Sequence, residues 1–309
     1  MKIRCLIFLV GLTCACSNTK EFTLKEKDLI PEGTAFNEET STVYIGSIYK
    51  QKILGIQPDG IEVDIITSDN FGIFSPLGME MDQQTYMLWV CAAVAPIVKH
   101  SPDVKRQTAI LAFDPSANRL IKKYVLDTES PAMLNDLTMD HEGNVYATET
   151  YQHKIYQVEK GNEKLSLFLE LNNYHHPNGI VYYEANHCLF IATDEGILKL
   201  NLETKELVLI EAAIDAKVID GLAIYDNYFI GHQSSKVSKF YFDEDISKIT
   251  RIETFDSGGA VDSSTTGEIG NGHYYYIVNS QLQSGINREE HVIKPMDSLE
   301  HVIIRKVKL

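Results

Sequence analysis

Short apolar stretches alternate with polar turns along most of the chain. In several stretches the apolar side chains fall at every second position, as in residues 154–160 (KIYQVEK) and 236–244 (KVSKFYFDE). This alternation is typical of half-buried antiparallel strands. No segment carries a sustained apolar stripe with the 3.6-residue period of a helix. The pattern therefore predicts an all-β protein with little helix.

One unit of this pattern occurs six times. Each copy begins with a polar or turn residue and a small residue, continues as a short apolar strand, turns, and returns as a second strand. The copies begin at Glu32, Leu77, Asn135, Asn178, Asp220 and Thr266. The spacing is 42–46 residues, apart from one step of 58, where residues 92–108 insert a Pro-containing loop. A period of about 40–45 residues predicts a six-bladed β-propeller with four-stranded antiparallel blades.

Two terminal strands belong to no complete copy. They are residues 22–30 (FTLKEKDLI) and residues 301–309 (HVIIRKVKL). We expect them to pair in the last blade, because pairing removes an exposed sheet edge and closes the ring. No linker interrupts the repeats, so residues 28–309 are expected to form one domain, which we expect to be a monomer.

The first fifteen residues are expected to be removed. Lys2 and Arg4 precede an apolar run, residues 5–12, that is shorter than the about 20 residues of a membrane-spanning helix, so residues 1–15 are typical of a signal peptide. Residues 13–16 (TCAC) resemble a lipobox, with Cys16 as the lipid acceptor and Cys14 as its competitor. An ordinary secreted protein is the alternative.

Removal of the signal peptide and lipidation of Cys16 would determine where the protein is located in the cell. Residues 16–27 would form a polar tether, and the protein would be an exported lipoprotein at the periplasmic or outer-membrane face of the envelope. Its contact with the membrane would be through the lipid alone. The net charge is −15, and loss of the two positive charges in the signal peptide makes it −17. So acidic a surface repels phosphate backbones and disfavours nucleic-acid binding. Cys91 and Cys188 lie in apolar strands and are expected to be buried structural thiols.

The candidate chemistry lies where the inner strands begin. The first strand of each blade lines the central channel, so these six positions converge at one mouth of the ring. Four of them carry side-chain oxygen: Glu32, Asn135, Asn178 and Asp220. A set of only oxygen ligands suits Ca²⁺ best, then Mg²⁺ or Mn²⁺, while Zn²⁺ is less favoured because it normally recruits His or Cys. Asn-Gly and Asp-Gly are also common turn dipeptides, so turn formation is the alternative explanation.

Four short motifs resemble the signatures of the SMP-30/gluconolactonase/paraoxonase-like superfamily. They are Pro31-Glu32-Gly33, Leu134-Asn135-Asp136, Pro177-Asn178-Gly179 and Asp220-Gly221-Leu222. The resemblance implies a six-bladed propeller with a divalent cation, usually Ca²⁺, on its axis, and hydrolysis of lactones or related esters. It implies that Glu32, Asn178 and Asp220 bind the metal and that Asn135 binds metal, substrate or water. Asp220 would also be the general base, so Asp220 and Asn135 are the expected catalytic residues.

The substrate side of the site is less defined. Tyr174, His175 and His176 precede Asn178 and are candidate substrate contacts, with a surface loop as the alternative. The insertion at residues 92–108 is a candidate lid or a solvated loop. We expect a metal-dependent hydrolase of lactones or related esters. The alternative is a non-catalytic propeller that binds a ligand or a protein partner at the channel mouth. A metal-free propeller similar to strictosidine synthase is disfavoured by the intact oxygen set.

Overall fold

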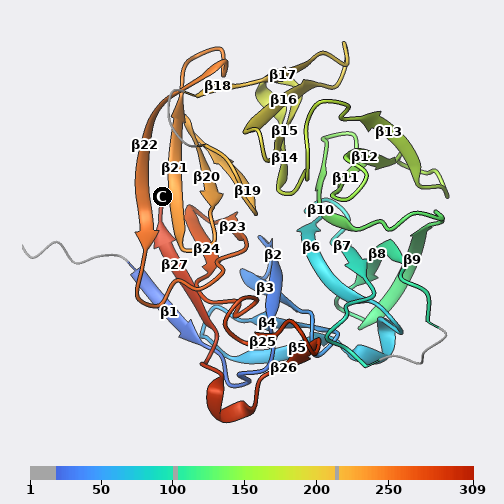
Figure 1. Cartoon of the computed structure of the whole chain (residues 1–309), viewed down its shortest axis with the longest axis vertical. Coiled ribbons are helices and arrows are strands. Elements are labelled where there is room, and N and C mark those ends of the chain that lie inside the picture. Colours follow the sequence, from blue (N-terminus) through green and yellow to red (C-terminus); the bar gives the residue numbers. More distant parts are fainter. Residues whose placement is uncertain (1–18, 100–103, 213–215) are drawn as a thin grey trace, which may run out of the picture.

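The computed structural model describes residues 19–99, 104–212 and 216–309. The expected signal peptide and Cys16 lie outside these residues. Six sheets of four antiparallel strands are arranged in a ring (Figure 1). The inner strands of successive blades contact one another in chain order, and β23 of the last blade contacts β2 of the first, which closes the circle. The prediction of an all-β, six-bladed propeller is confirmed.

Each blade is built from the channel outward in chain order, with the last blade completed by the N-terminal strand. Blades 1 and 2 consist of β2 (Pro31–Asn37), β3 (Thr42–Ser47), β4 (Lys52–Ile56) and β5 (Glu62–Ile66), and of β6 (Ser75–Met81), β7 (Leu88–Ala93), β8 (Thr108–Asp114) and β9 (Arg119–Leu126). Blades 3 and 4 consist of β10 (Leu134–Met139), β11 (Val145–Glu149), β12 (Lys154–Val158) and β13 (Ser166–Glu170), and of β14 (Ile180–Tyr183), β15 (Cys188–Ala192), β16 (Ile197–Asn201) and β17 (Leu207–Leu209). Blades 5 and 6 consist of β19 (Leu222–Tyr225), β20 (Tyr228–His232), β21 (Lys236–Phe242) and β22 (Lys248–Ser257), and of β23 (Gly267–Gly270), β24 (His273–Ile277), β27 (Ile303–Lys308) and β1 (Thr19–Thr23).

Few elements lie outside this scheme. β18 (Glu211–Ala212) adds a short parallel strand to β22, and β25 (Ile286–Asn287) pairs with β26 (Val292–Ile293). The helical elements of the described residues are three single 3₁₀ turns: η1 (Ser68–Asn70), η2 (Glu184–Asn186) and η3 (Met296–Ser298). None of these described helices has the length and apolarity needed to cross a membrane. The low helix content is thus as predicted, and Cys91 and Cys188 are buried free thiols.

The two chain ends meet as expected. β1 pairs antiparallel with β27, with Phe22 opposite Ile304, and Figure 1 shows the blue and red strands side by side. The strand begins earlier than the sequence pattern suggested, since Thr19–Thr23 lies within the segment expected to be a tether. Its polar composition has a physical cause. As the outermost strand of blade 6, β1 is mostly exposed, and Phe22 alone packs against the apolar core between blades 6 and 1.

Candidate functional site

The oxygen-bearing residues predicted at the channel mouth line one small cavity. Glu32, Asn135, Asn178 and Asp220 come from four blades and face a space of about 10 Å³. This is roughly the space of one water molecule or one ion. Asp136, Gly78, Gly221, Thr265 and Thr266 complete the lining. Leu77 does not take part, because its side chain is buried in the apolar core between blades 2 and 3.

The glycines that follow these residues bring neighbouring blades close together. A Cβ on Gly33 would lie 1.9 Å from the backbone oxygen of Leu77, and one on Gly179 would lie 2.5 Å from that of Asp220. Neither glycine has a positive φ, so neither is required by a left-handed turn. Turn formation therefore does not explain the repeated glycine. Gly33 and Gly179 each leave out a side chain where the inner strand of the next blade passes, so neighbouring blades approach closely at the mouth of the ring.

Asp136 is a component of the site that the sequence analysis did not single out. It occupies the position that glycine holds in the other five repeats, where Gly33, Gly78, Gly179, Gly221 and Gly267 stand. Its Oδ1 accepts a hydrogen bond from the backbone N–H of Leu137 at 2.9 Å, and its Oδ2 accepts one from Ile180 at 3.2 Å. The departure from glycine in one repeat was the signal that could have identified this residue.

Two amides are oriented by hydrogen bonds from their NH₂ groups, and no described residue donates to their oxygens. Asn178 Nδ2 donates to Asp220 Oδ1 at 2.8 Å. Asn135 Nδ2 donates to Thr150 Oγ1 at 3.0 Å, and that hydroxyl donates to the carbonyl of Pro177 at 2.9 Å. Because an amide NH₂ group only donates, these bonds fix which end of each amide is available to a cation.

Three carboxyl groups share this poorly solvated mouth, and their pKa values respond. Burial is the main cause that raises the pKa of Asp220 to about 7, against the hydrogen bond from Asn178. Burial likewise raises the pKa of Asp136 to about 7, opposed by the N–H groups of Ile180 and Leu137. The pKa of Glu32 is raised well above its usual range by burial first and then by the charges of Asp220 and Asp136. Without a cation, Asp220 and Asp136 therefore ionise around neutral pH and not near pH 4.

The donor set fits a hard divalent cation. It combines carboxylate and amide oxygens, and no Lys, Arg, His or Cys among the described residues lines the cavity. Within the three described ranges, no three His, Cys, Asp or Glu side chains are gathered closely enough to hold a metal by themselves. A cation at this point would therefore need the amide oxygens of Asn135 or Asn178 in addition to the carboxylates.

The three candidate substrate contacts lie outside this cavity. His175 Nδ1 is 2.6 Å from Glu195 Oε1, and His176 Nδ1 is 2.7 Å from Asp194 Oδ2, with both imidazoles exposed. Tyr174 packs against the apolar core between blades 3 and 4. The loop that carries the two histidines joins β13, the outer strand of blade 3, to β14, so it lies on the same face of the ring as the cavity.

The insertion of blade 2 is on this face as well. It joins β7 to β8, and β7 returns the chain to the end of the ring where β6 begins. Ala95, Ile97 and Val98, in its first half, pack against the core between blades 2 and 3. This part of the insertion is therefore anchored to the ring, whereas residues 100–103 lie outside the described residues.

Known proteins resemble this chain in structure. No protein-family model and no curated protein matches its sequence. A gluconolactonase from Xanthomonas campestris is similar with a TM-score of 0.63 and 14% identity, over 94% of this chain and 89% of that one. An inactive virginiamycin B lyase from Staphylococcus aureus, solved with quinupristin, gives 0.61 and 12%, over 94% and 99%. A luciferin-regenerating enzyme gives 0.61 and 12%, over 94% and 96%.

These neighbours bear on the fold. The resemblance to gluconolactonases seen in the four motifs is confirmed at the level of the six-bladed ring. The three proteins share the architecture, yet their names describe three different activities. Fold alone therefore assigns no reaction, and the functional argument depends on the residues of the site.

Proposed function

We propose that this protein is a divalent-cation-dependent hydrolase of lactones or related esters, with Ca²⁺ as the preferred cation. The observation that carries the proposal is the single ion-sized cavity lined by Glu32, Asn135, Asn178 and Asp220. A cation removes the cost of keeping three carboxylates charged in a poorly solvated place, and so explains why they lie together. The gluconolactonase among the structural neighbours supports the choice of lactones.

The residues of the site would have different roles in cation binding and in proton transfer. Glu32, Asn178 and Asp220 would hold the cation, with Asn135 or Asp136 beside them. The bound cation would polarise the carbonyl of the lactone and stabilise the oxyanion that forms. Asn178 positions Asp220 through Oδ1. The other oxygen of Asp220 is then available to take a proton from the attacking water.

The competing proposal is a propeller that binds a ligand and performs no reaction. It is favoured by the absence of basic side chains from the described lining of the cavity, since none is there to recognise a sugar acid. The lyase among the structural neighbours has the same fold and a different activity, so the fold does not by itself favour hydrolysis. The two proposals differ in turnover and agree on cation binding.

The test uses the soluble chain from Asn18 onward. Metal content and the melting temperature with and without Ca²⁺ report binding, and a panel of lactones and aryl esters reports turnover. Asp220→Asn should lower turnover by about 100-fold or more, because general acid–base groups contribute at least that much. Asp226→Asn is the matched control, since Asp226 is exposed at the opposite end of β19.

A second pair of variants separates binding from folding. Glu32→Gln should weaken Ca²⁺ binding and leave the ring folded, while the exposed Glu39→Gln should change neither. Ca²⁺ binding with no turnover on any member of the panel would favour the ligand-binding protein. No binding of Ca²⁺, Mg²⁺ or Mn²⁺ to a folded wild-type chain would exclude the proposed hydrolase.

We further propose that the protein is held at the cell envelope by a lipid on Cys16. The support is the signal-peptide pattern of residues 1–15 and the lipobox-like residues 13–16. β1 begins at Thr19, so the chain between the lipid and the ring would be very short. Radiolabelled palmitate should be incorporated in cells expressing wild type and lost in Cys16→Ser. Retention in Cys16→Ser and loss in Cys14→Ser would assign the lipid to Cys14.

A further inference from the structure

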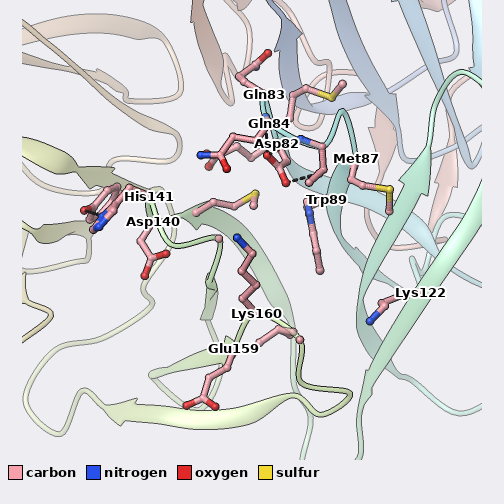
Figure 2. A pocket seen from close by; sticks show the side chains of 18 of the residues that line it. Asp82, Gln83, Gln84, Met87, Trp89, Lys122, Asp140, His141, Glu159 and Lys160 are labelled. Carbon is pink, nitrogen blue, oxygen red and sulfur yellow. Dashed lines mark hydrogen bonds between the residues drawn. The ribbon is translucent and has the colours of Figure 1, made fainter.

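A much larger cavity lies at the opposite end of the ring, between blades 2 and 3. It is a groove of about 600 Å³ bounded by the turns that follow β6 and β10 (Figure 2). These turns lie where the inner strands end, whereas the oxygen-lined cavity lies where they begin. One wall is a cross-strand row of blade 2, in which Glu80 faces Trp89, Trp89 faces Ala112, and Ala112 faces Lys122.

Trp89 supplies a hydrogen-bond donor with no acceptor. It is the only tryptophan of the chain. Its Nε1 is buried and has no hydrogen-bond partner among the described residues. The ring of Tyr124 stacks beside it, with centroids 6.1 Å apart and planes inclined by 18°. An unpaired buried donor is costly, and an acceptor on a ligand would remove that cost.

Lys160 supplies a positive charge without a partner. Its side chain is exposed and makes no ion pair within the described part of the chain, whereas Lys122 is paired with Glu163 at 2.6 Å. Its alkyl chain lies across Gly143, where a Cβ would come within 3.3 Å of it. Figure 2 shows the Lys160 amine and the Trp89 indole pointing into the same space, while the carboxylate of Glu159 points away.

The groove is also lined by acidic residues, and two of them accept hydrogen bonds within their own turns. Asp82 accepts hydrogen bonds from the backbone N–H groups of Gln84 and Thr85 at 2.8 and 3.2 Å. Asp140 accepts from the backbone of Glu142 and Asn144 at 3.0 and 2.9 Å. Both carboxylates therefore stabilise the turns in which they lie. Burial, and then the charge of Glu268, raises the pKa of Glu80 well above its usual range.

The equivalent groove between blades 1 and 2 provides an internal comparison. It is of similar size, about 840 Å³, and its described lining includes Glu39, Asp59 and Asp114 but no Lys, Arg or His. It also contains no tryptophan. The combination of an indole N–H and an ammonium without partners among the described residues therefore distinguishes the groove between blades 2 and 3 from the one between blades 1 and 2.

We propose that the groove between blades 2 and 3 is a second binding site, for a small organic carboxylate with a flat ring or short apolar body. The ring would lie between Trp89 and the side chains of Met81 and Met139, which line the groove. The carboxylate would accept hydrogen bonds from Trp89 Nε1 and Lys160 Nζ. This inference is independent of the proposed hydrolase, since none of these residues lines the oxygen-bearing cavity.

The single tryptophan makes the test direct. Fluorescence of the folded chain is excited selectively at Trp89 and titrated with benzoate, cyclohexanecarboxylate and the neutral benzamide. The carboxylates should change the emission with a dissociation constant on the order of millimolar, as expected for ligands of this size. Lys160→Gln should weaken benzoate about tenfold, in line with a charged hydrogen bond. Lys164→Gln, in an exposed turn outside the groove, should leave the constant unchanged.

Four results would overturn the assignment. No change with either carboxylate would exclude the site, and equal binding of benzamide would exclude recognition of the charge. A response to glucose in place of the carboxylates would identify a sugar site. Loss of benzoate binding in Glu32→Gln would move the ligand to the other end of the channel. Failure of the hydrolase proposal, by contrast, would leave every one of these titrations unchanged.

Discussion

Asn178 donates a hydrogen bond from Nδ2 to Oδ1 of Asp220 over 2.8 Å, although 42 positions separate the two residues. Each lies where an inner strand begins, in blades 4 and 5, and the backbone N–H of Gly179 bonds to the carbonyl of Asp220 at 2.8 Å as well. The pair therefore joins two neighbouring blades at the channel mouth. It also fixes the orientation of one carboxylate and one amide toward the same small space.

The Asn178–Asp220 bond should matter for cation binding. Asn178→Ala removes an amide oxygen from the cavity and the hydrogen bond that lowers the pKa of Asp220. We expect Ca²⁺ affinity to fall at least about tenfold, because hydrogen bonds to charged groups are worth roughly 1.5–3 kcal/mol. Calorimetric titration measures this. Asn227→Ala, in an exposed turn of blade 5, is the control, and equal losses in both variants would contradict the role of Asn178.

The stability of the cation-free protein should depend on pH in a defined direction. Folding raises the pKa of Asp136 and Asp220 from 3.8 to about 7, so the folded protein holds protons that the unfolded chain has already released. Stability from these groups is present at low pH and is lost as the pH rises from about 4 to about 7. Ca²⁺ should reverse the loss, because it favours the ionised carboxylates.

Another group opposes this trend and must be separated from it. Burial lowers the pKa of His232 to about 3, so His232 contributes stability that falls as the pH drops below its usual value of 6.5. The informative quantity is therefore the difference between wild type and Asp220→Asn. In chelator, melting temperatures should fall less steeply with rising pH in Asp220→Asn than in wild type or Asp226→Asn. Parallel curves for all three proteins would show that Asp220 does not carry the effect.

The close approach of blades 1 and 2 should make Gly33 intolerant of any side chain. In Gly33→Ala the new Cβ would overlap the backbone oxygen of Leu77, which cannot move without shifting β6. We expect a loss of about 3 kcal/mol in the free energy of unfolding. Gly161→Ala provides the comparison: its Cβ meets nothing within 4 Å, and its positive φ alone should cost about 1 kcal/mol. Urea denaturation measures both, and equal losses would refute the steric explanation.

The closure of the ring should depend on Arg305. Its guanidinium bonds to Glu21 of β1, at 2.6 Å from Nη2, and to Asp256 of β22, so it joins the N-terminal strand to blade 5. The side chain is only 16% exposed. Arg305→Met leaves Asp256 partly buried with the hydroxyl of Tyr276 but no cation as its partner, and we expect a loss of about 3 kcal/mol.

Arg251 offers a matched comparison for this prediction. Its pair with Glu253 is exposed, with 57% and 48% of the side chains accessible, so Arg251→Met should cost less than about 1 kcal/mol. Thermal unfolding of both variants gives the difference. A smaller loss in Arg305→Met than in Arg251→Met would mean that the closure is held by the backbone pairing of β1 and β27 alone.

Much of the architecture could be predicted from local patterns. Period-two alternation identified the strands, and the repeat starting at Glu32, Leu77 and their counterparts fixed the number of blades. These features are local because each blade is one supersecondary unit that repeats the same burial pattern. The boundary of β1 was the exception. An outermost strand is exposed on most of its surface, so Thr19–Thr23 carries little of the apolar signal by which strands are recognised.

The candidate site, like the fold, was predicted from the sequence only in part. The sequence by itself identified Glu32, Asn135, Asn178 and Asp220, since their shared register is visible in the repeat. Only the tertiary structure revealed that Asp136 joins them, that Leu77 turns into the core, and that the repeated glycines allow blades to touch. It alone placed Trp89 and Lys160 across one groove. A repeat specifies where each strand begins, but contacts between blades depend on residues far apart in the chain, which meet only when the ring is closed.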